Sequence, residues 1–136
     1  MRFSDKPLTT LDFDKICGLL ASCAATEGAK ALCRCLTPSD DLVDITRRLE
    51  RTGDARRLTD AKGMPPFGTV LDVSGACERA EKGAMLSTRE LLDVARLLRS
   101  ARALTDYNKT NRTFTTSLDE VFARLLCNRT LEDRIT

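Results

Sequence analysis

The chain has 136 residues, of which 42% are hydrophobic, 31% charged and 4% aromatic. It contains no His and no Trp, and its formal net charge at pH 7 is +2. The lack of histidine excludes Ser–His and Cys–His nucleophile pairs and histidine zinc sites. The small net charge argues against a dedicated nucleic-acid-binding domain, which usually carries a larger and clustered basic excess.

The length suits one domain with its own core, so we expect a single domain over 1–136. No uninterrupted apolar run approaches the ~18 residues that a membrane span needs. The first seven residues lack the apolar stretch of a secretory signal. We therefore expect a cytoplasmic protein with no membrane partner.

Six cysteines are spread along the chain, at positions 17, 23, 33, 35, 77 and 127. A disulfide scaffold would normally come with an export signal, which is not visible here. Zinc sites need Cys-x-x-Cys pairs, and the one close pair, Cys33 and Cys35, would point apart on a helix. We expect small buried thiols and no metal ligands.

The first two elements are predicted to be short helices. Apolar side chains after Thr10 recur at the three- and four-residue spacing of a buried helical face. These side chains are Phe13, Ile16, Leu20 and Cys23. A second helix is expected over 29–36 and is ended by Thr37-Pro38-Ser39.

A third helix is expected to begin near Asp40 and Asp41, with Ser39 as its cap. It should stop at Gly63, since a glycine followed shortly by proline ends helices. Its predicted apolar stripe is Leu42, Ile45, Leu49 and Thr52.

Residues 63–68, Gly-Met-Pro-Pro-Phe-Gly, form the one long break. The spacing of Gly63 and Gly68-Thr69 partly matches a phosphate-binding loop. The lysine of that motif is missing, however, and prolines replace amides that would hold the phosphates. We expect a crossover anchored by Phe67 and no nucleotide site.

The clearest helix is predicted from Thr88 to about Asp106, opened by a capping box of Ser87 and Glu90. A short helix before it, capped by Asp72, should run through Lys82. The apolar positions of the 88–106 helix cover about half its circumference, more than one neighbour requires, so we expect it to be central.

A last helix is expected after Thr116, with Ser117 and Glu120 as a second capping box. Residues 128–136 have an amphipathic pattern without a stop signal, so the chain is expected to be cut from something larger. With no strand alternation, the sequence predicts an all-α bundle of about six helices.

Arginines on the 88–106 helix are the candidate functional residues. Arg89, Arg96 and Arg99 lie on a similar side and form a tentative nucleic-acid or partner face. The alternative, which we favour, is a solvated face balanced by carboxylates, with Asp93 beside Arg96 and Asp106 beside Arg102. No catalytic constellation is present, so no catalytic, cofactor-binding or metal-binding residue is assigned.

Several strings resemble the opening of a known family. The most specific are Pro65-Pro66-Phe67-Gly68 and the run from Arg79 to Leu92, and weaker ones lie at 11–16, 25–30, 36–42, 47–52, 55–58 and 131–135. They are similar to the N-terminus of the second bacterial MutS paralogue family, MutS-type ATPases with a C-terminal Smr nuclease domain. Two departures are Thr69, where the family tends to have a second glycine, and Ser74-Gly75, where it usually has a basic residue and proline.

The resemblance implies an N-terminal fragment of a larger protein, part of the helical core and lever region of a MutS fold. It further implies that the full-length protein forms a homodimer and binds branched DNA. In the family such proteins control homologous recombination, and members bind rRNA and split collided ribosomes. ATP, Mg²⁺ and endonuclease activity belong to later domains, so this segment itself needs no cofactor.

Two other functions stay open at this point. One is a free-standing helical protein-interaction module, and the other is a nucleic-acid binder in its own right. The near-neutral charge makes the second of these the weaker.

Overall fold

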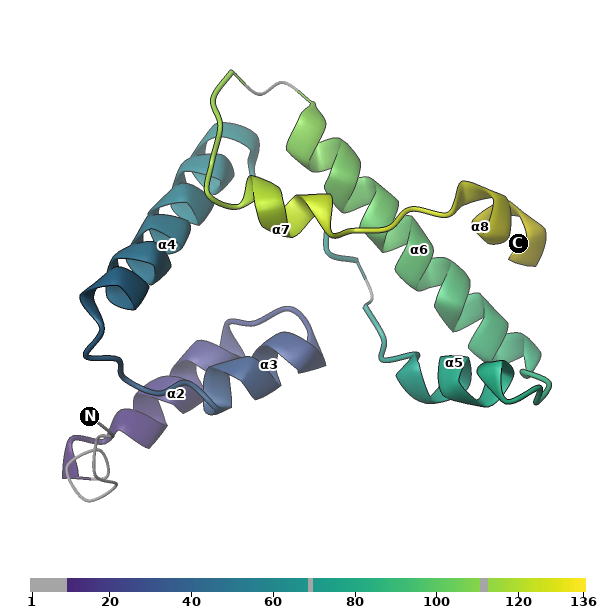
Figure 1. Ribbon diagram of the computed structural model, residues 1–136, viewed down its shortest axis with the longest axis horizontal. Helices are drawn as coiled ribbons and strands as arrows, with labels where there is room; N and C mark the ends of the chain where they lie inside the picture. Colours follow the sequence, from purple (N-terminus) through teal and green to yellow (C-terminus); the bar gives the residue numbers. More distant parts are fainter. Residues whose placement is uncertain (1–9, 69, 111–112) are drawn as a thin grey trace. The chain divides into compact units, whose positions relative to one another are not determined.

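The computed structural model describes residues 10–68, 70–110 and 113–136, and no strand occurs among them. The prediction of an all-α fold is confirmed (Figure 1). Seven helices lie in the described ranges: α2 (Phe13–Ser22), α3 (Glu27–Arg34), α4 (Leu42–Lys62), α5 (Ser74–Glu81), α6 (Thr88–Lys109), α7 (Asp119–Ala123) and α8 (Arg129–Ile135). None of the helices in these ranges is long and apolar enough to cross a bilayer.

The chain divides into two compact units, one ending at Leu49 and the other beginning at Glu50. The division falls inside α4, whose helical hydrogen bonding continues through it. Each unit is described separately below, and a single domain over 1–136 stays a prediction.

In the first unit, α2 packs against α3, and Thr26 caps α3 by accepting from the amide of Ala29 at 3.1 Å. The predicted buried face of α2 is wrong, because Ile16 and Leu20 are exposed. The buried residues are Cys17 and Ala21. Small side chains let a neighbouring helix approach closely, so they face the contact that larger ones would obstruct.

The start of α4 also differs from the expectation. Asp41, and not Ser39, caps the helix, because its carboxylate accepts from the amide of Val43 at 2.9 Å. The hydroxyl of Ser39 instead accepts from the amide of Asp41 at 3.3 Å. The predicted stripe is wrong at Leu42 and Leu49, which are exposed.

The end of α4 agrees with the prediction. The helix finishes at Lys62, and Gly63 follows with φ of 77°. The buried residues of α4 are Asp54 and Leu58, both in the second unit.

The second unit is built around α6, and α7 and α8 both pack against it, as expected of a central helix. The capping box of Ser87 and Glu90 is present with both of its hydrogen bonds. Glu90 also pairs with Arg79 of α5. Asp72 accepts from the amide of Ser74 at 2.9 Å, which confirms it as the residue that satisfies the start of α5.

The second predicted capping box is wrong, because Ser117 bonds to α4 and not to Glu120. The amide and hydroxyl of Ser117 donate to Oδ2 of Asp54 at 2.7 and 2.8 Å. These hydrogen bonds hold the pKa of the Asp54 carboxyl below its ordinary value, the backbone amide contributing most. The buried carboxylate of Asp54 thus accepts both hydrogen bonds from Ser117. At the start of α7, the amide of Thr116 donates to Asp119 instead.

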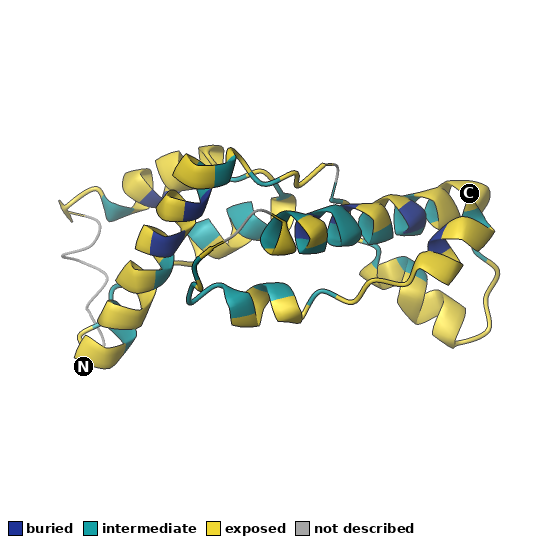
Figure 2. Ribbon diagram, turned by 90° about the horizontal axis from the view of Figure 1, so that it is seen from above, coloured by how far each residue is buried: buried dark blue, intermediate teal, exposed yellow. Residues whose placement is uncertain are grey.

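Buried positions are few in both units, as the dark blue segments of Figure 2 show. Among the described residues, the buried apolar side chains are those of Cys17, Ala21, Leu58, Ala95 and Leu104. Much of the apolar content therefore stays in solvent, including Leu126, which is 85% exposed.

Candidate nucleic-acid interface and apolar cavity

The three predicted face residues, Arg89, Arg96 and Arg99, are all exposed on α6. Arg96 donates from Nη1 to Asp93 at 3.0 Å, which is the pair that the sequence predicts. Arg99 and Arg102 instead reach a carboxylate of α8, so the hydrogen bonds of Arg102 do not go to the predicted partner Asp106.

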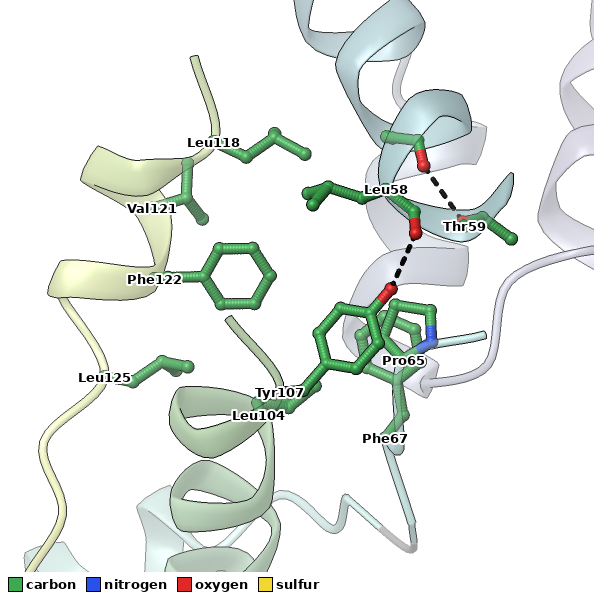
Figure 3. Close-up of a pocket in the computed structure, with 11 residues that line it drawn as sticks. Leu58, Thr59, Pro65, Phe67, Leu104, Tyr107, Leu118, Val121, Phe122 and Leu125 are labelled. Atoms are coloured by element: carbon green, nitrogen blue, oxygen red, sulfur yellow. Dashed lines mark hydrogen bonds between the residues drawn. The ribbon is translucent and has the colours of Figure 1, made fainter. Parts of the chain in front are cut away.

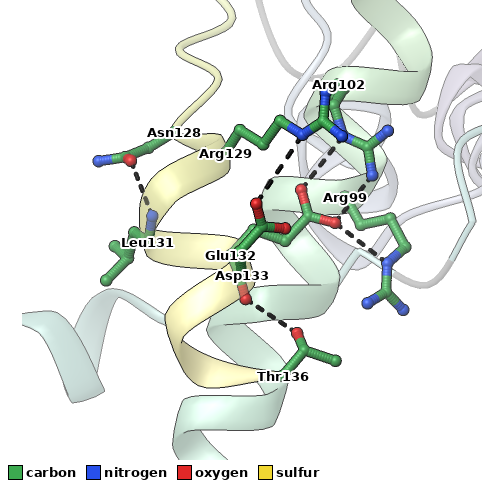
Figure 4. A network of polar contacts seen from close by, with 8 residues as sticks. All are labelled: Arg99, Arg102, Asn128, Arg129, Leu131, Glu132, Asp133 and Thr136. Atoms are coloured by element: carbon green, nitrogen blue, oxygen red, sulfur yellow. Dashed lines mark hydrogen bonds and ion pairs between the residues drawn. The ribbon is translucent and has the colours of Figure 1, made fainter.

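Glu132 is the centre of this network and is only 4% exposed (Figure 4). Its Oε1 accepts from Nε of Arg99 at 3.2 Å and from Nη2 of Arg102 at 2.8 Å. Its Oε2 accepts from Nε of Arg102 at 3.2 Å, so Arg102 binds the carboxylate in the bidentate way that guanidinium groups favour.

The protonation of this network follows from its hydrogen bonds. Donation by Arg102, with a smaller contribution from Arg99, holds the pKa of Glu132 below its ordinary value of 4.5. The same carboxylate raises the pKa of Arg102. At neutral pH the ionised carboxylate of Glu132 therefore offsets part of the positive charge of the arginines on α6.

Local structure positions Glu132 on α8. The side chain of Asn128 caps the helix by accepting from the amide of Leu131 at 3.0 Å. Glu132 lies 30 residues from Arg102 in the sequence. Glu132 could not be identified from the sequence, because its position there indicates only an acidic residue near the start of a helix.

A hollow of about 370 Å³ opens beside two of the predicted arginines. Its lining comes from the 66–68 crossover and from α6: Pro66, Gly68, Arg96, Arg99, Ser100 and Ala103. Gly68 has φ of 59°, and a Cβ built on it would lie 3.0 Å from Oγ of Ser100. A side chain at this position would crowd Ser100, so glycine eases the close approach of the crossover to α6. Thr69, where the family tends to have a second glycine, lies outside the described residues.

A second cavity, of about 320 Å³, is almost purely apolar (Figure 3). Among its lining residues are Leu58 of α4, Leu104 of α6 and Phe122 of α7, and Phe67 contributes from the crossover, consistent with its expected role as an anchor. The hydroxyl of Tyr107 donates to the carbonyls of Gly63 and Leu58 at 2.8 and 3.3 Å, so this polar group is already satisfied. The remaining lining residues are Ala55, Thr59, Pro65, Leu118, Val121 and Leu125.

The cysteines do not follow the expectation of burial. Cys17 is buried and Cys33 half-buried, whereas Cys23, Cys35, Cys77 and Cys127 are exposed, and all six are free thiols. Of the four exposed cysteines, only Cys77 lies within a helix; Cys23 and Cys35 follow the ends of α2 and α3, and Cys127 precedes α8. Within the described ranges, no group of three or more His, Cys, Asp or Glu residues is placed to hold a metal ion.

Known proteins resemble this chain along most of its length. Endonuclease MutS2 of Acetivibrio thermocellus is 35% identical over 135 residues, which is 97% of this chain. Endonuclease MutS2 proteins of Clostridium botulinum and Clostridium perfringens are 37% and 38% identical over 76% of it. This chain is related to a segment of the MutS2 proteins.

The relationship covers only part of each MutS2 relative. The chain spans 17% of the Acetivibrio thermocellus protein and 13% of the two clostridial ones. No family model matches the chain. The resemblance seen in the sequence is thus confirmed for a MutS2-related region, and what whole MutS2 proteins do comes to this chain only by proposal.

Proposed function

We propose that this chain is the non-catalytic, N-terminal helical core-and-lever segment of a MutS-like DNA-binding ATPase and endonuclease. The observation that carries the proposal is the 35% identity across 97% of the chain to a protein named Endonuclease MutS2. A segment that makes up 17% of such a protein leaves room for ATP, Mg²⁺ and nuclease sites in the other segments. The role of this segment is then mechanical: its helices support the other segments of the parent protein and transmit conformational changes between them.

Exposed apolar side chains support a role inside a larger assembly. Large exposed apolar surface marks contact sites in soluble proteins. Here it is contributed by both units, for example by Leu32, Val43, Met85 and Leu126. In the proposed parent protein these side chains would be covered by neighbouring segments.

The wider biology follows from the same relationship. The parent protein would be cytoplasmic, would form a homodimer and would bind branched DNA. It would act in the control of homologous recombination, in the splitting of collided ribosomes through rRNA contacts, or in both.

A chimera tests the proposal. The matched region of the Acetivibrio thermocellus protein is replaced by this chain, and dimerisation and ATP hydrolysis are measured. We expect both to persist within several-fold of the unmodified protein. A control chimera carrying Leu58→Asp, which places a charge at a buried site, should lose them. A soluble chimera that neither dimerises nor hydrolyses ATP would contradict the proposal.

The apolar cavity favours a second candidate function, a free-standing helical module that binds a protein partner. Such a module would be encoded by a reading frame that stops after Thr136, and the isolated chain would be a stable monomer or closed homodimer. A frame that continues into a phosphate-binding loop and an Smr-like domain would exclude it and favour the core-and-lever segment. Sequencing of the transcript past the codon for Thr136 decides between the two.

A further inference from the structure

The hollow beside Gly68 combines an open cavity with two guanidinium groups. Arg96 and Arg99 line it together with Ser100, and none of the described residues that line it is acidic. Its volume of about 370 Å³ falls in the range of small-molecule sites. Positive side chains at the wall of a concave surface select anions.

The ion pairs of these arginines leave part of each guanidinium accessible. Nη1 of Arg96 donates a hydrogen bond to Asp93, and Nε of Arg99 donates one to Glu132. The two arginine side chains remain 56% and 54% exposed. Since a guanidinium carries five N–H donors, one such contact does not exhaust it.

Glu132 is at the same time a partner and a competitor for these arginines. Carboxylates and phosphates are both bound by guanidinium groups in a bidentate way. A phosphate that draws Arg99 into the hollow would leave the buried carboxylate of Glu132 without one of its two arginine partners, which destabilises a buried charge. Because Glu132 lies in the seven-residue helix α8, the docking of this helix on α6 would weaken when the phosphate binds.

We propose that Arg96, Arg99 and the hollow beside Gly68 bind a phosphate of a nucleic-acid backbone, and that Glu132 of α8 restrains this binding by occupying Arg99 and Arg102. The inference rests on the proposed function, since it names a contact for the nucleic acid of the parent protein. Arg89 lies about 10 Å, or two helical turns, before Arg96 and adds to the row without lining the hollow.

The test uses the whole 136-residue chain, labelled duplex DNA and a salt series from 50 to 200 mM, values chosen because phosphate contacts are salt-sensitive in this range. Arg96→Gln combined with Arg99→Gln should weaken binding about tenfold or more. It should also reduce the slope of affinity against salt by about 2, one for each lost contact. Arg124→Gln, which removes an exposed arginine directly after α7, should leave the slope of DNA affinity against salt unchanged.

Glu132→Gln provides a test with the opposite sign. It keeps the shape of the side chain and removes the competing charge, so DNA binding should become several-fold tighter. Glu120→Gln makes the same chemical change at an exposed site and should have little effect. If Glu132→Gln also loosens α8, the arginines are exposed further and tightening is still expected.

Two further measurements complete the experiment. Amide hydrogen exchange in 129–135 should become faster when DNA is bound. Pyrophosphate should compete for the same arginines but more weakly than the duplex. Pyrophosphate binding tighter than DNA would assign the site to a free phosphate and overturn the nucleic-acid part of the proposal.

The inference is overturned if the double arginine variant binds DNA as the unmodified chain does. It is also overturned if Glu132→Gln binds no more tightly than Glu120→Gln. Either result leaves the chimera experiment unaffected, so the two proposals fail separately.

Discussion

Gly68 shows how a single residue shapes the second unit. It has a left-handed backbone with φ of 59°, and the position of its missing Cβ is 3.0 Å from Oγ of Ser100. Both the conformation and the space therefore favour glycine. The close approach of the crossover to α6 at this point is eased by the missing side chain.

Gly68→Ala should reduce the free energy of unfolding by about 1–2 kcal/mol, because it combines backbone strain with a close contact. Gly53 is the matched control. It lies inside α4 with nothing within 4 Å of a built Cβ. Gly53→Ala should therefore increase the free energy of unfolding by up to about 1 kcal/mol. Urea denaturation followed by circular dichroism measures both changes, and equal signs would contradict this account.

At the scale of the element, helix starts depend on local partners in some places and on distant ones in others. Ser87 caps α6 with Glu90, three residues away. Ser117 has the same pattern with Glu120 but bonds to Asp54 of α4, 63 residues away. The segment before α7 is thus held by α4 and not by its own helix.

A double-mutant cycle tests this attachment. Ser117→Ala and Asp54→Asn should be non-additive in the free energy of unfolding, because both variants alter the hydrogen bond between the Ser117 hydroxyl and the Asp54 carboxylate. Ser117→Ala and Glu120→Gln should be additive. As a reference, Ser87→Ala should cost about 1 kcal/mol, the usual effect of losing an N-cap. A coupling energy between Ser117 and Glu120, with none between Ser117 and Asp54, would contradict this attachment and support the predicted capping box.

The docking of α8 should depend on pH through Glu132. Its pKa is depressed in the folded chain by Arg102 and Arg99, so its contribution to stability is present above the unfolded value of 4.5. That contribution is lost as the pH falls below this value and through the lower folded pKa. Hydrogen exchange or a probe on α8 should show release in this acidic window, and Glu132→Gln should remove this part of the pH dependence.

At the scale of the whole molecule, stability rests on very few buried side chains. Leu58 is 2% exposed and lines the apolar cavity, so it is one of the residues that hold the second unit together. Leu126, at the other extreme, is almost entirely in solvent. A chain with this distribution of apolar surface has little stability to lose.

Leu58→Ala should lower the free energy of unfolding by about 2–5 kcal/mol, the usual range for a buried leucine. This is a large part of the roughly 5–15 kcal/mol of an ordinary domain, so the second unit should be close to unfolding. Leu126→Ala should change it by no more than about 0.5 kcal/mol. Thermal or urea denaturation compares the two, and similar losses at both sites would contradict the assigned core.

Sequence reasoning succeeded where the deciding contacts are local. The end of α4 at Gly63, the capping box at Ser87 and the pairing of Arg96 with Asp93 all involve residues within four positions of one another. It failed at α2, where an apolar stripe was expected to be buried. Periodicity indicates which side chains share a face, but the packing of α3 on small residues decided which face is covered.

The candidate site divides in the same way. The all-α fold, the relationship to MutS2 and the common side of Arg89, Arg96 and Arg99 on one helix can all be inferred from the amino-acid sequence alone. These properties follow from residue type and helical spacing, which do not depend on long-range contacts. Three features require the folded chain: the pairing of Glu132 with Arg99 and Arg102, the hydrogen bonds from Ser117 to Asp54, and the hollow between Gly68 and α6. Those contacts join residues 30 to 63 positions apart, where chain folding and not local geometry selects the partner.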